Sequence, residues 1–376
     1  MSVPTTEERQ YRIALSLVPR IGITWFKKLV NHFGSAKAVF EAAYQGDPVL
    51  PSTIAQRIVK NDSLQKAEEL LKSYEEAHIQ CITADDAAYP KRLLEIPDNP
   101  PIVYYKGTES LNKQRIVSII GTRQLTPYGK DAIAQFVTQL LPYNPLIVSG
   151  LAYGADIWAH KQALVQGLGT VAVLPTSLQE IYPPAHAKIA RQLMETGGGV
   201  LTEYPVGSGL GAYAFVARNR IVAGLSDATI VIEAKEKSGA LITAYYANSY
   251  HREVFALPGP ISAATSAGCH QLIKRNHAHL FTHIDDLVYL MNWSLYPKRK
   301  ATMEQALYAP YQLTLSEQTI LNQLEKETEP IAVDGLLHAT QLPPSQLQAS
   351  LLSLELQGLL RTLPGKRFAL TNRCQR

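Results

Sequence analysis

Apolar positions recur with two different spacings along the chain. In residues 85–291, short β-branched and aliphatic runs alternate with stretches of helical periodicity. Each run is apolar nearly throughout, which is typical of strands covered by helices on both faces of a sheet. The runs span residues 116–120, 146–149, 170–174, 199–203, 228–233 and 253–257. This alternation predicts an α/β domain with a doubly wound parallel sheet.

The regions on either side have a different pattern. Residues 5–84 predict short helices, and Pro19-Arg20-Ile21-Gly22 interrupts two of them as in a helix-hairpin-helix. Such a hairpin often approaches a phosphate backbone, but an all-helical packing module explains the pattern equally well. Residues 313–376 predict three helices and then a hairpin that turns at Pro364-Gly365, which together make a winged helix. The predicted domains are therefore 1–84, 85–292 and 313–376, with a linker at 293–312.

Composition and charge narrow the functional classes only slightly. The chain has 376 residues and a formal net charge of +4, which permits an anionic partner without requiring one. Cys81, Cys269 and Cys374 are far apart and form no CxxC motif, so we expect neither a disulfide framework nor a zinc ribbon. No signal pattern or membrane-length apolar run is evident. We expect a soluble, cytoplasmic protein that does not associate with membranes.

Three of the predicted strands are followed by loops that contain glycine. The carboxyl ends of strands in a doubly wound sheet are where ligands gather, and the unpaired N–H groups of a helix start attract anions. The candidate residues in these loops are Gly121, Thr122, Arg123, Ser149, Gly150, Lys237, Ser238 and Gly239. The loops predict an anion-binding edge. Neither GxGxxG nor GxxxxGK[ST] occurs here, so dinucleotide binding and nucleoside-triphosphate hydrolysis lack their usual signatures.

Residues 212–226 add aromatic and basic side chains. If this segment is helical, Phe215, Arg218 and Asn219 share one face, whereas Arg220 lies about 200° from Arg218. The two arginines therefore cannot clamp one phosphate from the helix body: either they contact different phosphates, or one forms a structural ion pair. An aromatic ring beside an arginine suits single-stranded nucleic acid, because a base stacks on the ring while the guanidinium meets a phosphate.

Structural rather than functional roles remain open for several individual residues. Phe215 could belong to the core, with Arg218 paired to Glu203 or Glu233. Three nearby histidines lack an evident carboxylate or cysteine partner, so we expect no metal site there; they are His277, His279 and His283. No GxSxG elbow surrounds Ser149, and the spacing from Asp156 to His160 is ordinary for a helix, so we expect no catalytic triad.

Seven runs, in order along the chain, resemble the DNA-processing protein A (DprA/Smf) family of bacteria. They are YPKRLLEIPDNPPIVYYKG, SIIGTRQLTPYG, VSGLAYGADIWAH, TVAVLPTSLQEIYPP, GVLTEYPVG, FVARNRIVAGLSDATIVIEAKEKSGALITA and REVFALPG. The resemblance implies an extended Rossmann-like domain that binds single-stranded DNA at the carboxyl ends of its strands. It also implies a homodimer formed through that domain, and loading of the RecA recombinase onto incoming DNA during natural transformation. No catalytic activity or cofactor is implied.

Positions that match the family's motifs extend the candidate site. By this resemblance the DNA pocket includes Gly121, Arg123, Ser149, Gly150, Phe215, Arg218, Arg220, Lys237, Ser238 and Gly239. Thr122 stands where serine is common in the family, and Pro175 where glycine is frequent. Cys269 and His270 replace a usual Thr-Asn pair, so the contacts of that turn are not carried over to this chain.

Two other functional classes remain as alternatives. Related Rossmann-like proteins cleave nucleoside monophosphates, but residues 233–244 lack the glycine run and the glutamate of the PGGxGTxxE pattern of such phosphoribohydrolases. A winged-helix regulator of transcription would need basic residues on its recognition helix, whereas residues 344–358 carry only one charge, Glu355. Basic residues follow at Arg361, Lys366, Arg367, Arg373 and Arg376. They favour backbone contact by the wing, or a protein–protein surface.

Overall fold

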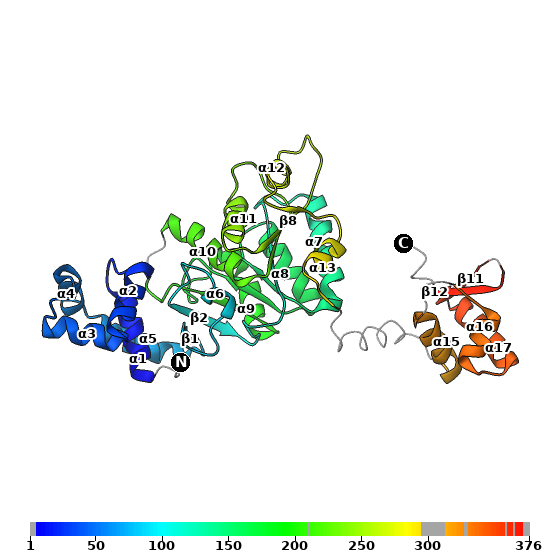
Figure 1. Cartoon of the computed structure of the whole chain (residues 1–376), viewed down its shortest axis with the longest axis horizontal. Coiled ribbons are helices and arrows are strands. Elements are labelled where there is room, and N and C mark those ends of the chain that lie inside the picture. The colour runs from blue at the N-terminus through cyan, green and yellow to red at the C-terminus, as the bar shows by residue number, and fades with distance from the viewer. Residues whose placement is uncertain are drawn as a thin grey trace. The chain divides into compact units, whose positions relative to one another are not determined.

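A computed structural model describes residues 5–208, 211–294, 313–326, 330–357, 359–363 and 365–370 (Figure 1). The chain divides into two compact units, Met1–Arg299 and Lys300–Arg376. Most of the linker predicted at 293–312 lies outside the described residues. The predicted boundary between residues 84 and 85 falls within the first unit and stays a prediction. Among the described residues, no helix has the length and apolarity that crossing a membrane would need.

The described part of the first unit contains one nine-stranded sheet, in the order β1-β2-β6-β5-β4-β3-β7-β8-β9 (Figure 1). Its strands are β1 (Gln80–Thr83), β2 (Ile102–Gly107), β3 (Ile116–Ile120), β4 (Leu146–Ser149), β5 (Thr170–Val173), β6 (Gly198–Thr202), β7 (Ala228–Val231), β8 (Glu253–Ala256) and β9 (His279–Leu280). Neighbours from β6 to β9 are parallel, whereas β1 and β2 add antiparallel strands at one edge. The predicted parallel sheet is confirmed, and β3 to β8 are its six predicted strands.

Helices cover both faces of this sheet because successive residues of a strand point to opposite sides. Val117 and Ile119 of β3 pack into the core beneath α7, α8 and α13, whereas Ile116 and Ile120 pack into the core that α10 and α11 cover. The helices of this region are α6 (Lys91–Leu94), α7 (Pro127–Leu140), α8 (Ala155–Val165), α9 (Ala187–Glu195), α10 (Ala212–Leu225), α11 (Gly239–Ser249), α12 (Ala267–Lys274) and α13 (Ile284–Leu290), with 3-10 turns at Leu141–Tyr143 and Pro184–His186.

The order of the parallel strands reverses between β3 and β7. From β3 the chain moves outward through β4 and β5 to β6, and then α10 returns it to the other side of β3, where β7 pairs with that strand. Ile120 and Val231, the last residues of these two strands, are partners in the register. The loops that follow β3 and β7 therefore begin side by side, at the kind of position where doubly wound folds bind ligands.

Five helices precede the sheet and share a core with it. They are α1 (Thr6–Leu17), α2 (Ile23–Phe33), α3 (Ala36–Gln45), α4 (Ser52–Val59) and α5 (Ser63–Glu76). Their buried side chains, such as Ile13 and Phe40, belong to the same hydrophobic cluster as Ile102 and Tyr104 of β2. The predicted helical character of this region is confirmed up to Glu76, but residues 80–83 form β1 and extend the sheet.

The second unit confirms the predicted winged helix. Its helices are α15 (Leu315–Lys326), α16 (Val333–Thr340) and α17 (Pro344–Leu356), and its strands are β10 (Ile331–Ala332), β11 (Leu360–Leu363) and β12 (Arg367–Leu370). β12 pairs with both β10 and β11. Gly365, in the turn of the hairpin, has a φ of +84°, a conformation that glycine adopts without strain. Pro364, Arg373 and Arg376 lie outside the described residues.

Candidate nucleic-acid interface

A cavity of about 430 Å³ lies at the carboxyl ends of β3, β4 and β7, where the strand order reverses. The loops after these strands, one face of α10 and the start of α11 enclose it. Ten of the predicted site residues line this cavity, and they are Gly121, Thr122, Arg123, Gly150, Phe215, Arg218, Asn219, Lys237, Ser238 and Gly239. The structure therefore brings together loops that are more than 100 residues apart in the chain.

The loop after β3 is held against the end of β7. The backbone N–H of Thr122 donates to the carbonyl oxygen of Glu233 over 2.7 Å. The buried Glu233 carboxylate accepts hydrogen bonds from the backbone N–H of Thr126 (3.0 Å) and from its hydroxyl (2.6 Å). Gly121 is required here, because a Cβ at this position would lie 2.8 Å from the Cβ of Ala155. Arg123 directly follows Thr122, so the contacts of Gly121, Thr122 and Thr126 hold its backbone in place at the cavity.

Arg218 provides a buried positive charge at this cavity. Only 5% of its surface is exposed, and its guanidinium donates to the carbonyl oxygens of Gly150 and Val173. Asp156 also lines the cavity, and its carboxylate accepts from the backbone N–H of Gly150 at 3.1 Å. Burial raises the pKa of Asp156, while the nearby Arg218 charge opposes that rise. Arg218 is therefore held by carbonyl oxygens and a neighbouring carboxyl rather than left to move with solvent.

The other basic groups of the cavity are exposed. Arg123, Lys235 and Lys237 all line it, and Lys235 donates to the Gln124 side chain over 3.0 Å. Within the described part of the chain, the charged groups of Arg123 and Lys237 form no hydrogen bond or ion pair. Asp156 is the one acidic side chain in this lining, against four basic ones. The cavity is thus electropositive, and Lys235 is a lining residue that sequence reasoning missed although it belongs to the loop already singled out.

The start of α11 adds uncharged hydrogen-bond donors. Ser238 is the N-cap of this helix, but its side chain makes no capping hydrogen bond, and its hydroxyl is buried without a partner among the described residues. A Cβ at Gly239, the first residue of the helix, would meet no atom within 4 Å. The first turn of a helix has unpaired N–H groups and a partial positive charge. This end of the cavity is therefore suited to an anion such as a phosphate.

Two predicted site residues do not line the cavity, which corrects the expectation for both. Arg220 is 5% exposed and forms an ion pair with Glu203, with Asp98 at 3.8 Å. Its position two residues after Arg218 turns it to another side of α10, so it is the structural arginine of the pair. Ser149 is fully buried, and its hydroxyl donates to the carbonyl oxygen of Ile119 over 2.7 Å. Ser149 does not line the cavity itself, but it precedes Gly150, which does.

The alternative roles considered for Arg218 and His160 are also resolved by their contacts. The acidic neighbour of Arg218 is Asp156, not Glu203 or Glu233. His160 is fully buried and lies 2.7 Å from the hydroxyl of Thr170, and burial lowers its pKa to about 3. The hydroxyl of Ser149 bonds to a backbone carbonyl and not to His160. These contacts describe a packed interior rather than a nucleophile activated by a base.

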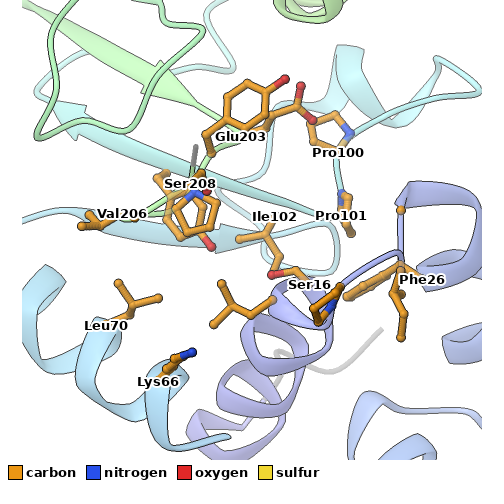
Figure 2. A pocket seen from close by; sticks show the side chains of 18 of the residues that line it. Ser16, Phe26, Lys66, Leu70, Pro100, Pro101, Ile102, Glu203, Val206 and Ser208 are labelled. Atoms are coloured by element: carbon orange, nitrogen blue, oxygen red, sulfur yellow. The ribbon is translucent and has the colours of Figure 1, made fainter. Parts of the chain in front are cut away.

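A larger cavity, of about 760 Å³, lies between the N-terminal helices and the sheet (Figure 2). Pro19, Ile21 and Gly22 of the predicted helix-hairpin-helix line it. Figure 2 shows mainly apolar side chains around it, including Phe26 and Ile102. Its charged lining residues are Lys66, Glu69 and Glu203, and Lys66 already pairs with Asp62 at 2.8 Å. The hairpin thus faces an apolar cavity with no excess of basic groups, which favours the packing interpretation of this motif.

Two family models match this chain. The family model of DNA recombination-mediator protein A matches residues 80–292, and the DprA winged helix domain model matches residues 304–366. The chain is 33% identical to the protein Smf of Synechocystis over 399 residues, which covers 96% of this chain and 98% of the relative. It is 35% identical to the protein Smf of Escherichia coli, over 80% of each chain.

Solved structures of relatives are similar to this chain. The DNA processing protein A of Streptococcus pneumoniae aligns with a TM-score of 0.63 and 32% identity, over 78% of this chain and all of that one. The DNA processing protein A of Helicobacter pylori, whose structure was described for its single-stranded DNA binding mode, aligns with a TM-score of 0.52 and 30% identity. That alignment covers 57% of this chain and 97% of the other.

Proposed function

Because this chain belongs to the DprA/Smf family of DNA recombination-mediator proteins, we propose that it binds single-stranded DNA in the cavity at the β3–β7 switch point. We further propose that it acts as a homodimer and loads RecA recombinase onto the bound strand, in recombination and in natural transformation. In this proposal the protein acts by binding and delivery, without catalysing a reaction and without a cofactor.

The observation that carries the proposal is the convergence of positive charge on one cavity. Arg123, Arg218 and Lys237 come from three separate segments and line the same hollow, together with the hydroxyl of Ser238, which has no partner among the described residues. Among the lining residues only Asp156 is acidic, against four basic side chains, while Glu233 faces Thr126 and Glu203 pairs with Arg220. A site of this kind binds a phosphodiester through charge and N–H groups, without reading sequence.

A single strand fits this site better than a duplex does. Phe215 lines the cavity beside Arg218 and is half-buried, so part of its ring is open to an incoming group. Bases stack on aromatic rings only when they are not paired inside a duplex. The winged helix supports the same preference, because α17 carries no basic residue with which to read a major groove.

The test is the salt dependence of binding. With about three to five phosphates neutralised, log affinity should fall against log salt with a slope of about −2 to −3.5 for a single strand. Replacing Arg123 and Lys237 by glutamine should weaken binding to all sequences alike and make the slope shallower by about 1.4. Lys60→Gln, on the exposed end of α4, removes the same charge away from the cavity and should change neither value.

Two results would contradict this proposal. One is a flat salt response of the wild-type protein, and the other is unchanged affinity in the Arg123/Lys237 double variant. A gel-shift comparison of single- and double-stranded DNA, with and without RecA, then tests the delivery step. We expect the wild-type protein to promote RecA assembly on single strands and the double variant to lose that effect.

A further inference from the structure

We propose that Tyr153 and Tyr182 form a stacking platform for nucleobases beside the phosphate-binding cavity. The proposal rests on the function proposed above and deepens it: the cavity takes the phosphates of a strand, and the two tyrosines take its bases. Tyr153 lies in the glycine-bearing loop after β4 and Tyr182 in the segment after β5, but neither is among the candidate site residues or the residues that line the cavity.

The two tyrosines border a hollow that is continuous with the cavity. This hollow measures about 60 Å³, and Tyr153, Tyr182, Pro175 and Pro183 line its outer part. Its remaining lining residues also line the cavity, and they are Arg123, Gly150, Ala152, Phe215 and Arg218. A DNA strand whose phosphate contacts Arg123 or Arg218 therefore lies beside the same hollow that both tyrosine rings line.

Both rings are held in place and yet exposed. Tyr182 packs edge-to-face against Phe215, with ring centroids 5.0 Å apart, and Tyr153 packs edge-to-face against His186 at 4.7 Å. His186 is buried and lies 2.7 Å from the carbonyl oxygen of Leu151. Even so, 42% of Tyr182 and 48% of Tyr153 is exposed to solvent. Rings that are already positioned lose little conformational freedom when a flat partner stacks on them.

The shape and charge of the hollow identify the partner as a nucleobase within a strand. Pockets that enclose a small molecule measure about 300–1,000 Å³, so this hollow is too small to enclose one. A flat group resting on the exposed rings needs no enclosure. The only charged side chains in the hollow are Arg123 and Arg218, among the described residues. Flat aromatic groups tethered to phosphates are the chemistry of single-stranded DNA, and exposed aromatics beside a basic groove are the usual way to bind it.

The experiment compares two oligomers of equal length and charge, an oligothymidylate and a deoxyribose-phosphate oligomer without bases. We expect the wild-type protein to bind the oligothymidylate at least about fivefold more tightly for each stacked base. Tyr153→Leu with Tyr182→Leu should reduce this difference by at least about fivefold and leave only what Phe215 contributes, while affinity for the abasic oligomer and the salt slope stay unchanged. Tyr153→Phe with Tyr182→Phe should keep the difference, because the rings remain. The matched control is Tyr245→Leu, another exposed tyrosine packed edge-to-face on a histidine, His277, outside both lining sets.

The outcomes separate this proposal from the one on which it rests. Equal binding of both oligomers by the wild-type protein would overturn the platform but not the phosphate cavity. A preference for bases that the double leucine variant leaves undiminished, or that Tyr245→Leu reduces equally, would also overturn it. Failure of the proposed function itself has a different signature: the wild-type protein binds neither oligomer, or binds both equally well after Arg123 and Lys237 lose their charges.

Discussion

Gly150 offers a sharp test of how the cavity is built, because a single methyl group there should collide with Arg218. A Cβ at Gly150 would lie 2.5 Å from Cζ and 2.6 Å from Nη2 of Arg218. Non-bonded heavy atoms prefer separations of about 3.5–4.0 Å, so the guanidinium would have to move by about 1 Å. Arg218 is buried and bonded to the carbonyl oxygens of Gly150 and Val173, so it has little room to move.

The size of the effect follows from the bonds that such a movement breaks. A hydrogen bond from a charged donor contributes about 1.5–3 kcal/mol, and one or both of the guanidinium bonds should be lost. We therefore expect Gly150→Ala to lower the free energy of unfolding by about 2–4 kcal/mol and to weaken binding of single-stranded DNA. The backbone does not contribute, because Gly150 has no positive φ. Denaturant unfolding followed by tryptophan fluorescence measures the change, since Trp25, Trp158 and Trp293 all belong to the first unit.

A matched control lies in the same cavity. Gly239→Ala adds the same methyl group where no atom lies within 4 Å, so we expect its free energy of unfolding to change by less than about 0.5 kcal/mol. The collision with Arg218 can be isolated in an Arg218→Met background, where Gly150→Ala should cost less than about 1 kcal/mol. Equal costs for Gly150→Ala and Gly239→Ala, or an undiminished cost in the Arg218→Met background, would refute this reasoning.

Two further predictions concern buried groups away from the cavity. Arg220→Leu leaves the Glu203 carboxylate buried without its cation, so the free energy of unfolding should fall by about 3–5 kcal/mol. The salt slope of DNA binding should stay the same, and a shallower slope would show that Arg220 contacts a phosphate. His160, with a pKa of about 3 when folded against about 6.5 when unfolded, is protonated first in the unfolded chain as the pH falls. The wild-type protein should therefore lose about 2 kcal/mol relative to His160→Gln between pH 7 and pH 5, and a constant difference between the two would contradict this assignment.

The six parallel strands β3 to β8 were predictable because their signal is local. A strand covered on both faces must be apolar along its whole length, and residues 116–120 or 146–149 show this directly. β1 and β9 have no such signal: β1 is four residues long and partly exposed, and β9 is a pair of exposed residues. Their pairing depends on the neighbouring strand that happens to lie beside them, and a short segment does not encode that neighbour.

The site was predictable to the extent that it follows from the topology of parallel strands. Parallel strands present their carboxyl ends at one edge, so Gly121, Arg123, Gly150 and Lys237 could be placed together from their positions after β-branched runs. Helical geometry alone also puts Arg218 and Arg220 on different sides of a helix, because two residues turn it by about 200°. It does not say which of them faces the cavity, because the two sides of a helix are equivalent until it packs.

The packing of α10 against the sheet determines which arginine faces the cavity. On one side of the packed helix, Arg218 contacts the carbonyl oxygens of Gly150 and Val173. On another side of the helix, Arg220 contacts Glu203. Local patterns of polarity thus set where the chain forms strands and which of its loops carry glycine and basic residues, since both depend on neighbours in sequence. The partner of each buried charge, and the exposure of Tyr153 and Tyr182 beside the cavity, were set by contacts between distant segments, because charges and rings interact through space rather than along the chain.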